Sequence, residues 1–218
     1  EIADRDWSSD VCSSDLCNNY SRMSFNFGPT LLSWLQENDP LCYDAILEAD
    51  AIGARRFSGH GTAMAQVYNH VIMPLANRRD KETQVLWGIA DFEKRFRRRP
   101  EGMWLAEAAV DTETLEVLAE NGILFTVLSP YQADSVRPCG GGVWQDAKGG
   151  RIDTTRPYRC SLPSGRSIAL FFYDGLLSQK IAFGGMLDNG EHFARQLIDA
   201  HPDRSEEHTS ELQSRSAI

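Results

Sequence analysis

Glu107 is the residue whose type and position in the sequence best suit a catalytic group. It lies in the stretch MWLAEAAV, which is otherwise apolar and runs up to a helical pattern. A carboxylate is costly to bury without a partner, so this one either faces an open site or pairs with a neighbouring loop or an arginine. In β/α barrels, catalytic groups stand at the carboxyl ends of strands, where Glu107 falls. Spacing alone leaves a catalytic and a structural role open.

Four more side chains are candidates for contacts with a substrate. Asp174 follows the apolar run IALFFY, so it either stands at a strand end or forms a turn. Trp104, close before Glu107, could stack on a sugar ring, with a place in the core as the alternative. His60 and His70 lack the H-x-x-x-H spacing of a metal-binding helix, because position 64 is Met. We therefore expect no metal site, and histidines that hydrogen-bond a substrate hydroxyl or the protein itself.

A strand, a helix and a second strand are predicted in the middle of the chain. Residues 102–108 and 123–129 are apolar runs of strand length. Between them, 111–121 has the pattern of a helix, with Asp111 as its N-cap and Gly122 just after its end. Two continuously apolar strands joined by a helix are typical of a parallel sheet that is covered on both faces.

Other patterns predict the remaining elements. Apolar residues at helical spacing indicate helices around 31–35, 43–47, 62–72, 80–99 and 190–201. Residues 167–174 suit a buried strand. The glycine-rich segment 139–150 has no flanking strand and helix at phosphate-loop spacing, so we expect a hairpin or loop there.

Both ends of the chain carry an unusual pattern. Residues 6–16 read DWSSDVCSSDL, and residues 204–215 read RSEEHTSELQSR. Codons can be chosen so that these segments are the two strands of one inverted DNA repeat, which resembles a sequencing-library adapter. We therefore interpret 1–16 and 204–218 as adapter-derived and expect them to be disordered. The domain proper is then 17–203, truncated at both ends.

The segment between the tails has an ordinary composition. The chain has 31 acidic and 22 basic residues, of which the tails hold eight and three, leaving 23 and 19, a net charge of −4. The segment lacks the excess of basic residues that would indicate a nucleic-acid partner. No apolar run in it reaches the roughly 18 residues that cross a bilayer. Four of the five cysteines lie in this segment without a C-x-x-C pair, which favours reduced thiols in a cytoplasmic protein.

Three stretches resemble a known family. GHGTAMAQVYNHVIMPLANRRDKETQVLWGIADFEKRF, RPEGMWLAEAAVDTETLEVLAENGILFTVLSPYQA and FFYDGLLSQKIAF are similar to glycoside hydrolase family 57, most of all to its branch of large bacterial proteins. The Trp-Leu-x-Glu element and the helix after it are the specific part. The resemblance runs from about Ser24 to the last predicted helix. It implies an α/β fold, a fragment of a (β/α)7 barrel that is TIM-barrel-like and incomplete at both ends.

The resemblance also implies an activity. It implies a retaining enzyme that hydrolyses or transfers α-linked glucans, with an oligo- or polysaccharide substrate and no cofactor. Glu107 matches the family's nucleophile, and His70 falls in its second motif, although the branch usually has proline where this chain has Ala106. The family's first motif should precede Ser24, and its acid/base aspartate should come from a later Asp-Gly-Glu-Thr-type segment. Neither is found, so we expect this chain alone to be inactive.

Two other functions stay open on the sequence. A metal-dependent polysaccharide deacetylase uses a similar barrel, but would need a closely spaced histidine pair. A non-catalytic carbohydrate-binding relative would bind glucan without turnover, also as the Glu107→Gln variant. In the glycosidase interpretation, the side chains expected to contact the substrate are His60, His70, Trp104 and Asp174.

Overall fold

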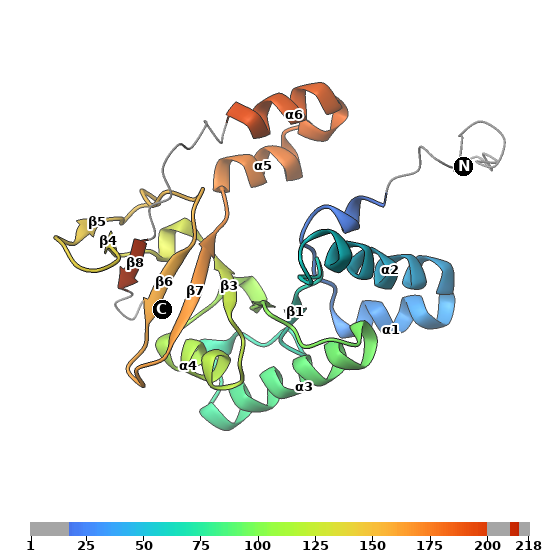
Figure 1. The fold of residues 1–218 in the computed structure, drawn as a ribbon, viewed down its shortest axis with the longest axis horizontal. Coiled ribbons are helices and arrows are strands. Elements are labelled where there is room, and N and C mark those ends of the chain that lie inside the picture. Colours follow the sequence, from blue (N-terminus) through green and yellow to red (C-terminus); the bar gives the residue numbers. More distant parts are fainter. Residues whose placement is uncertain (1–17, 200–209, 214–218) are drawn as a thin grey trace. The chain divides into compact units, whose positions relative to one another are not determined.

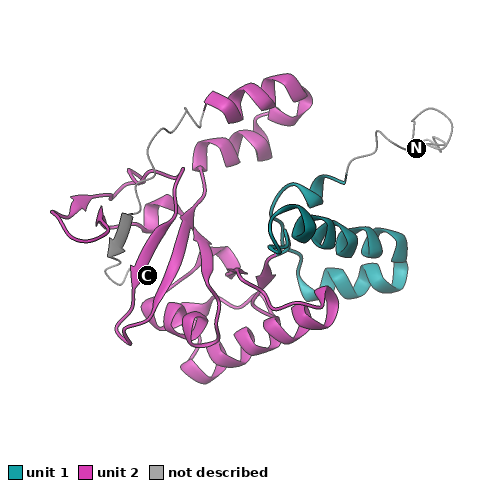
Figure 2. Ribbon diagram, viewed as in Figure 1, with its two compact units in different colours: residues 1–63 teal, residues 64–218 magenta. Residues whose placement is uncertain are grey.

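The computed structural model describes residues 18–199 and the backbone of 210–213. The chain divides into two compact units, residues 1–63 and 64–218 (Figure 2). Within the described residues, no helix combines the length and the apolar character that crossing a membrane requires. The described cysteines, Cys42, Cys139 and Cys160, are free thiols.

The first unit is helical. Its elements are η1 (Asn19–Ser21), α1 (Pro29–Asn38) and α2 (Pro40–Arg56). Asp39 ends α1 and caps α2, where its side chain accepts from the amide of Cys42. Pro40 suits the first turn of α2 because an amide there would lack a helical partner. The helix α2 extends beyond residues 43–47, where the sequence pattern predicts it, at both ends. The buried carboxylate of Asp50 accepts from the amide of Ala63 at 2.8 Å and closes the unit.

The second unit is an α/β fold. Its helices and helical turns are η2 (Met73–Leu75), α3 (Arg78–Phe96), η3 (Ala106–Ala108), α4 (Thr112–Glu120), η4 (Pro130–Gln132), α5 (Gly175–Phe183), η5 (Met186–Asp188) and α6 (Gly190–Asp199). Its strands are β1 (Ala65–Gln66), β2 (Met103–Trp104), β3 (Phe125–Leu128), β4 (Ser135–Pro138), β5 (Gln145–Asp146), β6 (Tyr158–Ser161), β7 (Ser167–Phe172) and β8 (Ser210–Gln213). β1 and β2 form one sheet, and the others form a mixed sheet in the order β3-β7-β6-β8-β4-β5 (Figure 1).

Four parallel strands bring their carboxyl ends to a common edge. β1 pairs with β2, and β3 pairs with β7, both in parallel. A parallel bridge between Gly102 and Phe125, and a 2.8 Å bond from Thr126 Oγ1 to the carbonyl of Met103, join β2 to β3. This confirms the predicted strand–helix–strand unit as β2, α4 and β3. The described residues form small sheets and not a closed barrel.

The predicted helix at 62–72 is wrong. The segment instead contains β1, whose Ala65 amide donates to the carbonyl of Gly102 at 3.0 Å. Ala63, Ala65 and Val67 are buried in alternation, which is the period of a strand. α3 packs closely on this strand: a Cβ built on Gly88 would lie 2.3 Å from the carbonyl oxygen of Gln66, so only glycine fits.

The other predicted elements near the site are confirmed. The helices expected at 80–99 and 111–121 are α3 and α4, and Asp111 caps α4 by accepting from the amide of Thr114 at 2.8 Å. The glycine-rich segment 139–150 contains the turn and the second strand of the β4–β5 hairpin. The strands are shorter than predicted, since β2 and β3 each pass into a helical turn that carries site residues.

The structure differs from the expected disorder of the tails at Ser210–Gln213. These four residues form β8, which pairs antiparallel with β4 and parallel with β6. Unpaired strand edges readily accept another strand, and β8 provides one to both neighbours. The expected disorder is therefore wrong for this short segment. Residues 1–16, 204–209 and 214–218 lie outside the described residues.

Candidate active site

Glu107 lies in a strained turn just after β2. In the turn η3, Glu107 has φ 56° and ψ 19°, and Ala108 has φ 52°. Left-handed backbone costs an ordinary residue about 1–2 kcal/mol, so two such residues in a row must be held by their surroundings. The turn exposes the side chain of Glu107 while Ala106 and Ala108 on either side stay buried. The backbone thus brings a single acid out of an apolar stretch.

One hydrogen bond within the turn and one from η4, after β3, hold the Glu107 turn. The amide of Ala108 donates to the carbonyl of Leu105 at 3.0 Å within the turn. The side-chain amide of Gln132, in η4, donates to the carbonyl of Ala108 at 2.8 Å. Gln132 is itself fixed, because its Oε1 accepts from the amide of Ser129 at 2.8 Å in a capping box. The loop after β3 therefore positions the loop after β2.

His70 is the direct partner of Glu107. Its Nε2 lies 2.9 Å from Glu107 Oε1, a contact in which an ionised carboxylate accepts from the imidazole. The two side chains are 67% and 69% exposed, so water screens the pair and it adds little to stability. The loop that carries His70 is tied to α3 by a 2.7 Å bond from the amide of Asn69 to Gln84 Oε1. The pair is open to a ligand from solvent.

A second group of charges, close by in sequence, is structural. The Nζ of Lys81, whose side chain is 2% exposed, donates to Asp111 at 2.7 Å and to Glu113 at 2.8 Å. Burial alone would lower the pKa of Lys81, but the hydrogen bonds and charges of the two acids hold that pKa above its ordinary value. Burial would raise the pKa of Asp111, but bonds from Lys81 and Thr114 hold it below its ordinary value. This cluster fixes the start of α4 just after the Glu107 turn.

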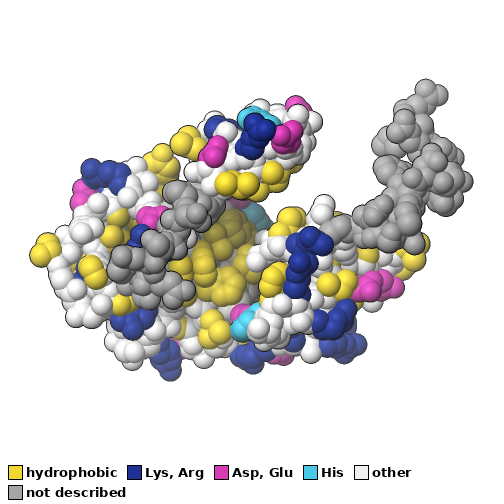
Figure 3. All heavy atoms as spheres, turned by 45° about the horizontal axis from the view of Figure 1, so that its top comes forward, with side chains coloured by type: hydrophobic (Ala, Val, Ile, Leu, Met, Phe, Trp, Pro, Cys, Tyr) yellow, Lys and Arg dark blue, Asp and Glu magenta, His cyan; other side chains and the backbone are white. Residues whose placement is uncertain are grey.

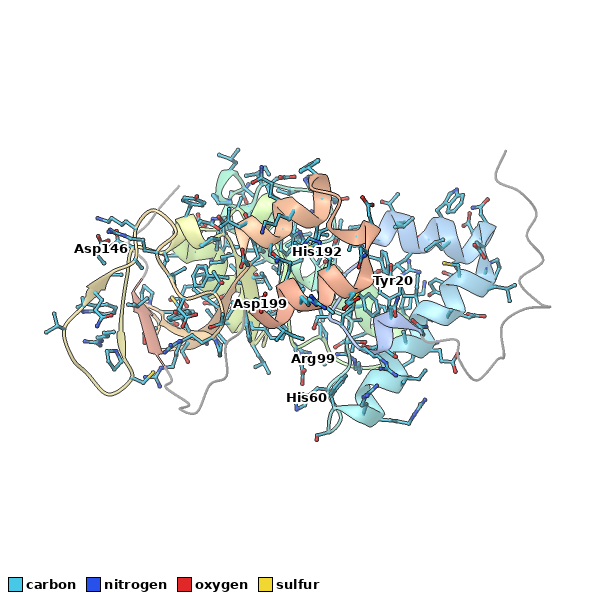
Figure 4. The ribbon with its side chains drawn as sticks, turned by 90° about the horizontal axis from the view of Figure 1, so that it is seen from above. Tyr20, His60, Arg99, Asp146, His192 and Asp199 are labelled. Carbon is cyan, nitrogen blue, oxygen red and sulfur yellow. The ribbon has the colours of Figure 1, made fainter. Side chains whose placement is uncertain are left out.

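The structure places the other predicted site residues in different settings. Asp174 accepts from the amide of Leu177 at 2.9 Å, so it caps α5, as the turn alternative predicts. Trp104 is half-buried on β2, three residues before Glu107. His60 lies in the exposed loop after α2, in the first unit (Figure 4). Contacts of these three residues with a substrate stay predictions.

Gln132 is a site residue that the sequence reasoning missed. Its signal is the capping-box pattern Ser-x-x-Gln in SPYQ, which follows an apolar strand. The pattern predicts the cap, but the bond across to Ala108 depends on the tertiary fold. Among the described residues, no group of three or more His, Cys, Asp or Glu side chains is placed to share a metal ion.

Parallel strands with an exposed carboxylate at their carboxyl edge define an α/β domain whose site is built from the loops after the strands. Sequence comparison gives the family, since the sequence profile described as glycosyl hydrolase family 57 matches residues 15–213. The chain therefore belongs to glycosyl hydrolase family 57.

Two solved structures share the fold. One is a 4-α-glucanotransferase from Thermococcus litoralis, with a TM-score of 0.58 and 21% identity over 86% of this chain and 26% of that chain. The other is an exo-type maltose-forming amylase from Pyrococcus sp. ST04, with a TM-score of 0.62 and 18% identity over 85% of this chain and 29% of that chain. This chain thus spans less than a third of the length of either relative. No curated protein matches it.

Proposed function

We propose that the whole protein is a retaining glycoside hydrolase or glucan transferase acting on α-linked glucans. Membership of glycosyl hydrolase family 57 supports this proposal. The solved structures of similar fold are described as a 4-α-glucanotransferase and a maltose-forming amylase. We further propose that the parallel strands β1, β2, β3 and β7 belong to a (β/α)7 barrel. The cytoplasmic location predicted from cysteine usage is part of the same proposal.

Glu107 is the proposed nucleophile. The observation that carries this role is the strained turn, which presents one exposed carboxylate beside His70 at the carboxyl edge of the parallel strands. Unusual backbone of this kind concentrates at functional sites because the surrounding structure must hold it. The side chain of Glu107 reaches solvent, so the strained backbone presents this carboxylate and does not bury it.

The proposed chemistry needs two carboxylates. A Glu107 oxygen attacks the anomeric carbon and forms a glycosyl ester, while the bond to the leaving glycosidic oxygen breaks and an acid protonates that oxygen. Water or an acceptor hydroxyl then attacks the same carbon, gives its proton to the acid/base group, and frees the Glu107 carboxylate. Retaining enzymes place the two carboxyl groups about 5–5.5 Å apart. We propose that the acid/base group is an aspartate of the same protein that is not among these 218 residues.

His70 is proposed to orient Glu107 and to contact a substrate hydroxyl. Its Nε2 already holds one carboxylate oxygen, which leaves the other free to attack. His60, Trp104 and Asp174 are the further substrate contacts that we propose. Asp174 stands after β7 at the same edge of the strands, although its role as a helix cap accounts for one of its oxygens.

Two matched substitutions test the role of Glu107 in the protein extended to include its acid/base residue. Glu107→Gln should abolish glucan turnover, by on the order of 10³-fold or more, without lowering Tm, because its side chain is exposed. Glu113→Gln is the control, since this glutamate pairs with Lys81 and should lower stability by about 1 kcal/mol or less while turnover persists. Glucan binding with no turnover in the unaltered protein would instead favour a non-catalytic relative.

A further inference from the structure

A cavity lies at the carboxyl ends of β3 and β7, in the second unit. Its volume is about 550 Å³, within the range of about 300–1,000 Å³ that small-molecule sites occupy. Pro130 and Tyr131 line it from the turn after β3, and Tyr173 and Asp174 line it from the end of β7. Figure 3 draws the side chains by type and shows hydrophobic side chains exposed on the face in view.

The chemistry of the lining favours a neutral ligand with many hydroxyl groups. Aromatic and apolar surface comes from two tyrosines and from Ile152 and Leu176, and hydrogen-bonding groups come from Thr154, Gln179 and Asp174. Among the described residues, no Lys, Arg or His lines the cavity, so an anionic ligand would meet an acid and no compensating cation from this part of the chain. Sugars combine an apolar ring face with hydroxyl groups around the rim, which matches this lining.

Tyr131 is placed to stack on a ring. Its side chain is 74% exposed although it lines the cavity. A Cβ built on Gly150, whose φ is +78°, would lie 3.4 Å from the tyrosine ring, so the ring packs against the glycine backbone. Tyr173 is 37% exposed, and its amide donates to the carbonyl of Leu128 at 3.1 Å, which ties it to the end of β3. The ring of Tyr131 thus has a packing contact with Gly150, and the backbone of Tyr173 is fixed at the end of β3.

The part of the cavity lining at Ile152 and Thr154 is fixed by Asp153, which lies between them in sequence. Its carboxylate accepts from the amide of Thr155 at 3.0 Å and from Arg156 Nε at 2.8 Å. Its carbonyl accepts from the hydroxyl of Tyr158 at 2.9 Å. A segment held by these bonds loses little conformational entropy when a ligand binds.

The cavity is joined to the Glu107 turn by η4. Pro130 and Tyr131 of this turn line the cavity, and the next residue, Gln132, donates to the carbonyl of Ala108. A chain of sugars bound in the cavity would therefore be placed relative to the nucleophile through one short, capped segment.

We propose that this cavity is a sugar-binding subsite, in which one glucosyl unit of an α-glucan stacks on Tyr131 and hydrogen-bonds to Thr154, Gln179 and Asp174. The inference rests on the proposed function, because it adds a subsite to the same strand-end site. It assigns to the cavity a part of the substrate that is bound without being attacked.

Titration of the chain with maltotriose, followed by amide NMR, tests the subsite. Tyr131→Ala should weaken binding about tenfold, and Tyr131→Phe should bind within about twofold of the unaltered chain, because the ring is kept. Asp174→Asn should weaken binding several-fold and still cap α5, since asparagine is an equally good cap. Phe183→Ala, which removes an aromatic ring that is 89% exposed on α5 and outside the cavity, should have no effect.

Several outcomes would overturn the proposal. One is that Tyr131→Ala binds maltotriose as tightly as the unaltered chain. Another is that Phe183→Ala weakens binding as much as Tyr131→Ala does. The third is that the unaltered chain gives a well-dispersed spectrum but does not bind maltotriose. If Tyr131→Ala loses that dispersion, Thr154→Val replaces it as the test variant. Failure of the subsite would appear in maltotriose binding, whereas failure of the proposed function would appear as glucan turnover that survives Glu107→Gln in the extended protein.

Discussion

Glu107 and Asp111 are two acids four residues apart that the fold treats in opposite ways. Asp111 accepts from a buried lysine and from both the amide and the hydroxyl of Thr114, and its pKa is lowered by these bonds against the effect of burial. Among the described residues, Glu107 has one side-chain partner, His70, and its side chain is 69% exposed.

The charges of the Asp111 cluster stabilise the fold, whereas the carboxylate of Glu107 is accessible to a substrate. The Asp111 cluster sits on relaxed backbone and uses its acids to hold α3 and α4 together. The Glu107 turn has left-handed backbone. A hydrogen bond from Gln132 holds it, so that one carboxylate is presented to solvent. We therefore expect substitutions at the turn to reduce activity and substitutions in the cluster to reduce stability.

Gln132→Leu should give the largest effect among the positioning residues. It removes the bond to Ala108 and the cap at Ser129, so the turn can relax and move the Glu107 carboxylate. We expect kcat of the extended protein to fall about 10- to 100-fold, because small displacements of a reacting group have effects of this size. KM should change much less, since the substrate contacts remain.

Gln145→Leu is the matched control for Gln132→Leu. Gln145 is an exposed residue of β5, in the hairpin, and its replacement should leave both kinetic constants unchanged. A purely structural role for Gln132 would instead lower Tm and leave kcat per folded molecule unchanged.

Lys81→Met should have the next largest effect, and on stability. It leaves Asp111 and Glu113 as two acids without their shared cation at the start of α4. Because both acids are partly exposed, we expect a loss of about 2 kcal/mol in the free energy of unfolding, less than for a fully buried pair. Urea unfolding measures it. A larger loss of unfolding free energy in Glu107→Gln than in Lys81→Met would contradict this difference between the two acids.

The smallest effect is a dependence of stability on acid pH. Bonds from Thr155 and Arg156 lower the pKa of Asp153 to about 2, although burial opposes them. A lowered pKa in the fold adds stability above the ordinary value near 3.8, and that stability is lost as pH falls toward about 2. Asp111 contributes in the same direction. Urea unfolding of Asp153→Asn between about pH 4 and about pH 2 should show a shallower loss than the unaltered chain, and an identical loss would contradict the account.

Local patterns in the sequence predict the helices near the site well. The apolar stripe of α3, the Asp111 cap and the glycine after α4 each act within a few residues, so they can be read without the fold. The strand β1 could not be predicted as easily, because its two residues pair with β2 from nearly forty positions away. Its alternation of Ala63, Ala65 and Val67 is a weak signal beside the stronger helical pattern.

The candidate site was predicted in part. Glu107 and His70 could be named from their types and from a family resemblance, but their contact comes from the parallel pairing of β1 and β2. The left-handed turn could not be predicted, since neither Glu107 nor Ala108 is a residue that favours it. β8 was missed because its pairing depends on two strands far from it in sequence.

Covalent labelling of Glu107 tests the central claim most directly. A glucosyl fluoride that is slowed by ring fluorination carries a leaving group that needs no protonation, so the nucleophile can be trapped without the acid/base residue. After proteolysis, mass spectrometry should place one fluoroglucosyl group on Glu107, and Glu107→Gln should remain unlabelled while Glu113→Gln is labelled normally. A label on another carboxylate, or none in a protein that turns over α-glucan, would contradict the assignment of Glu107 as the nucleophile.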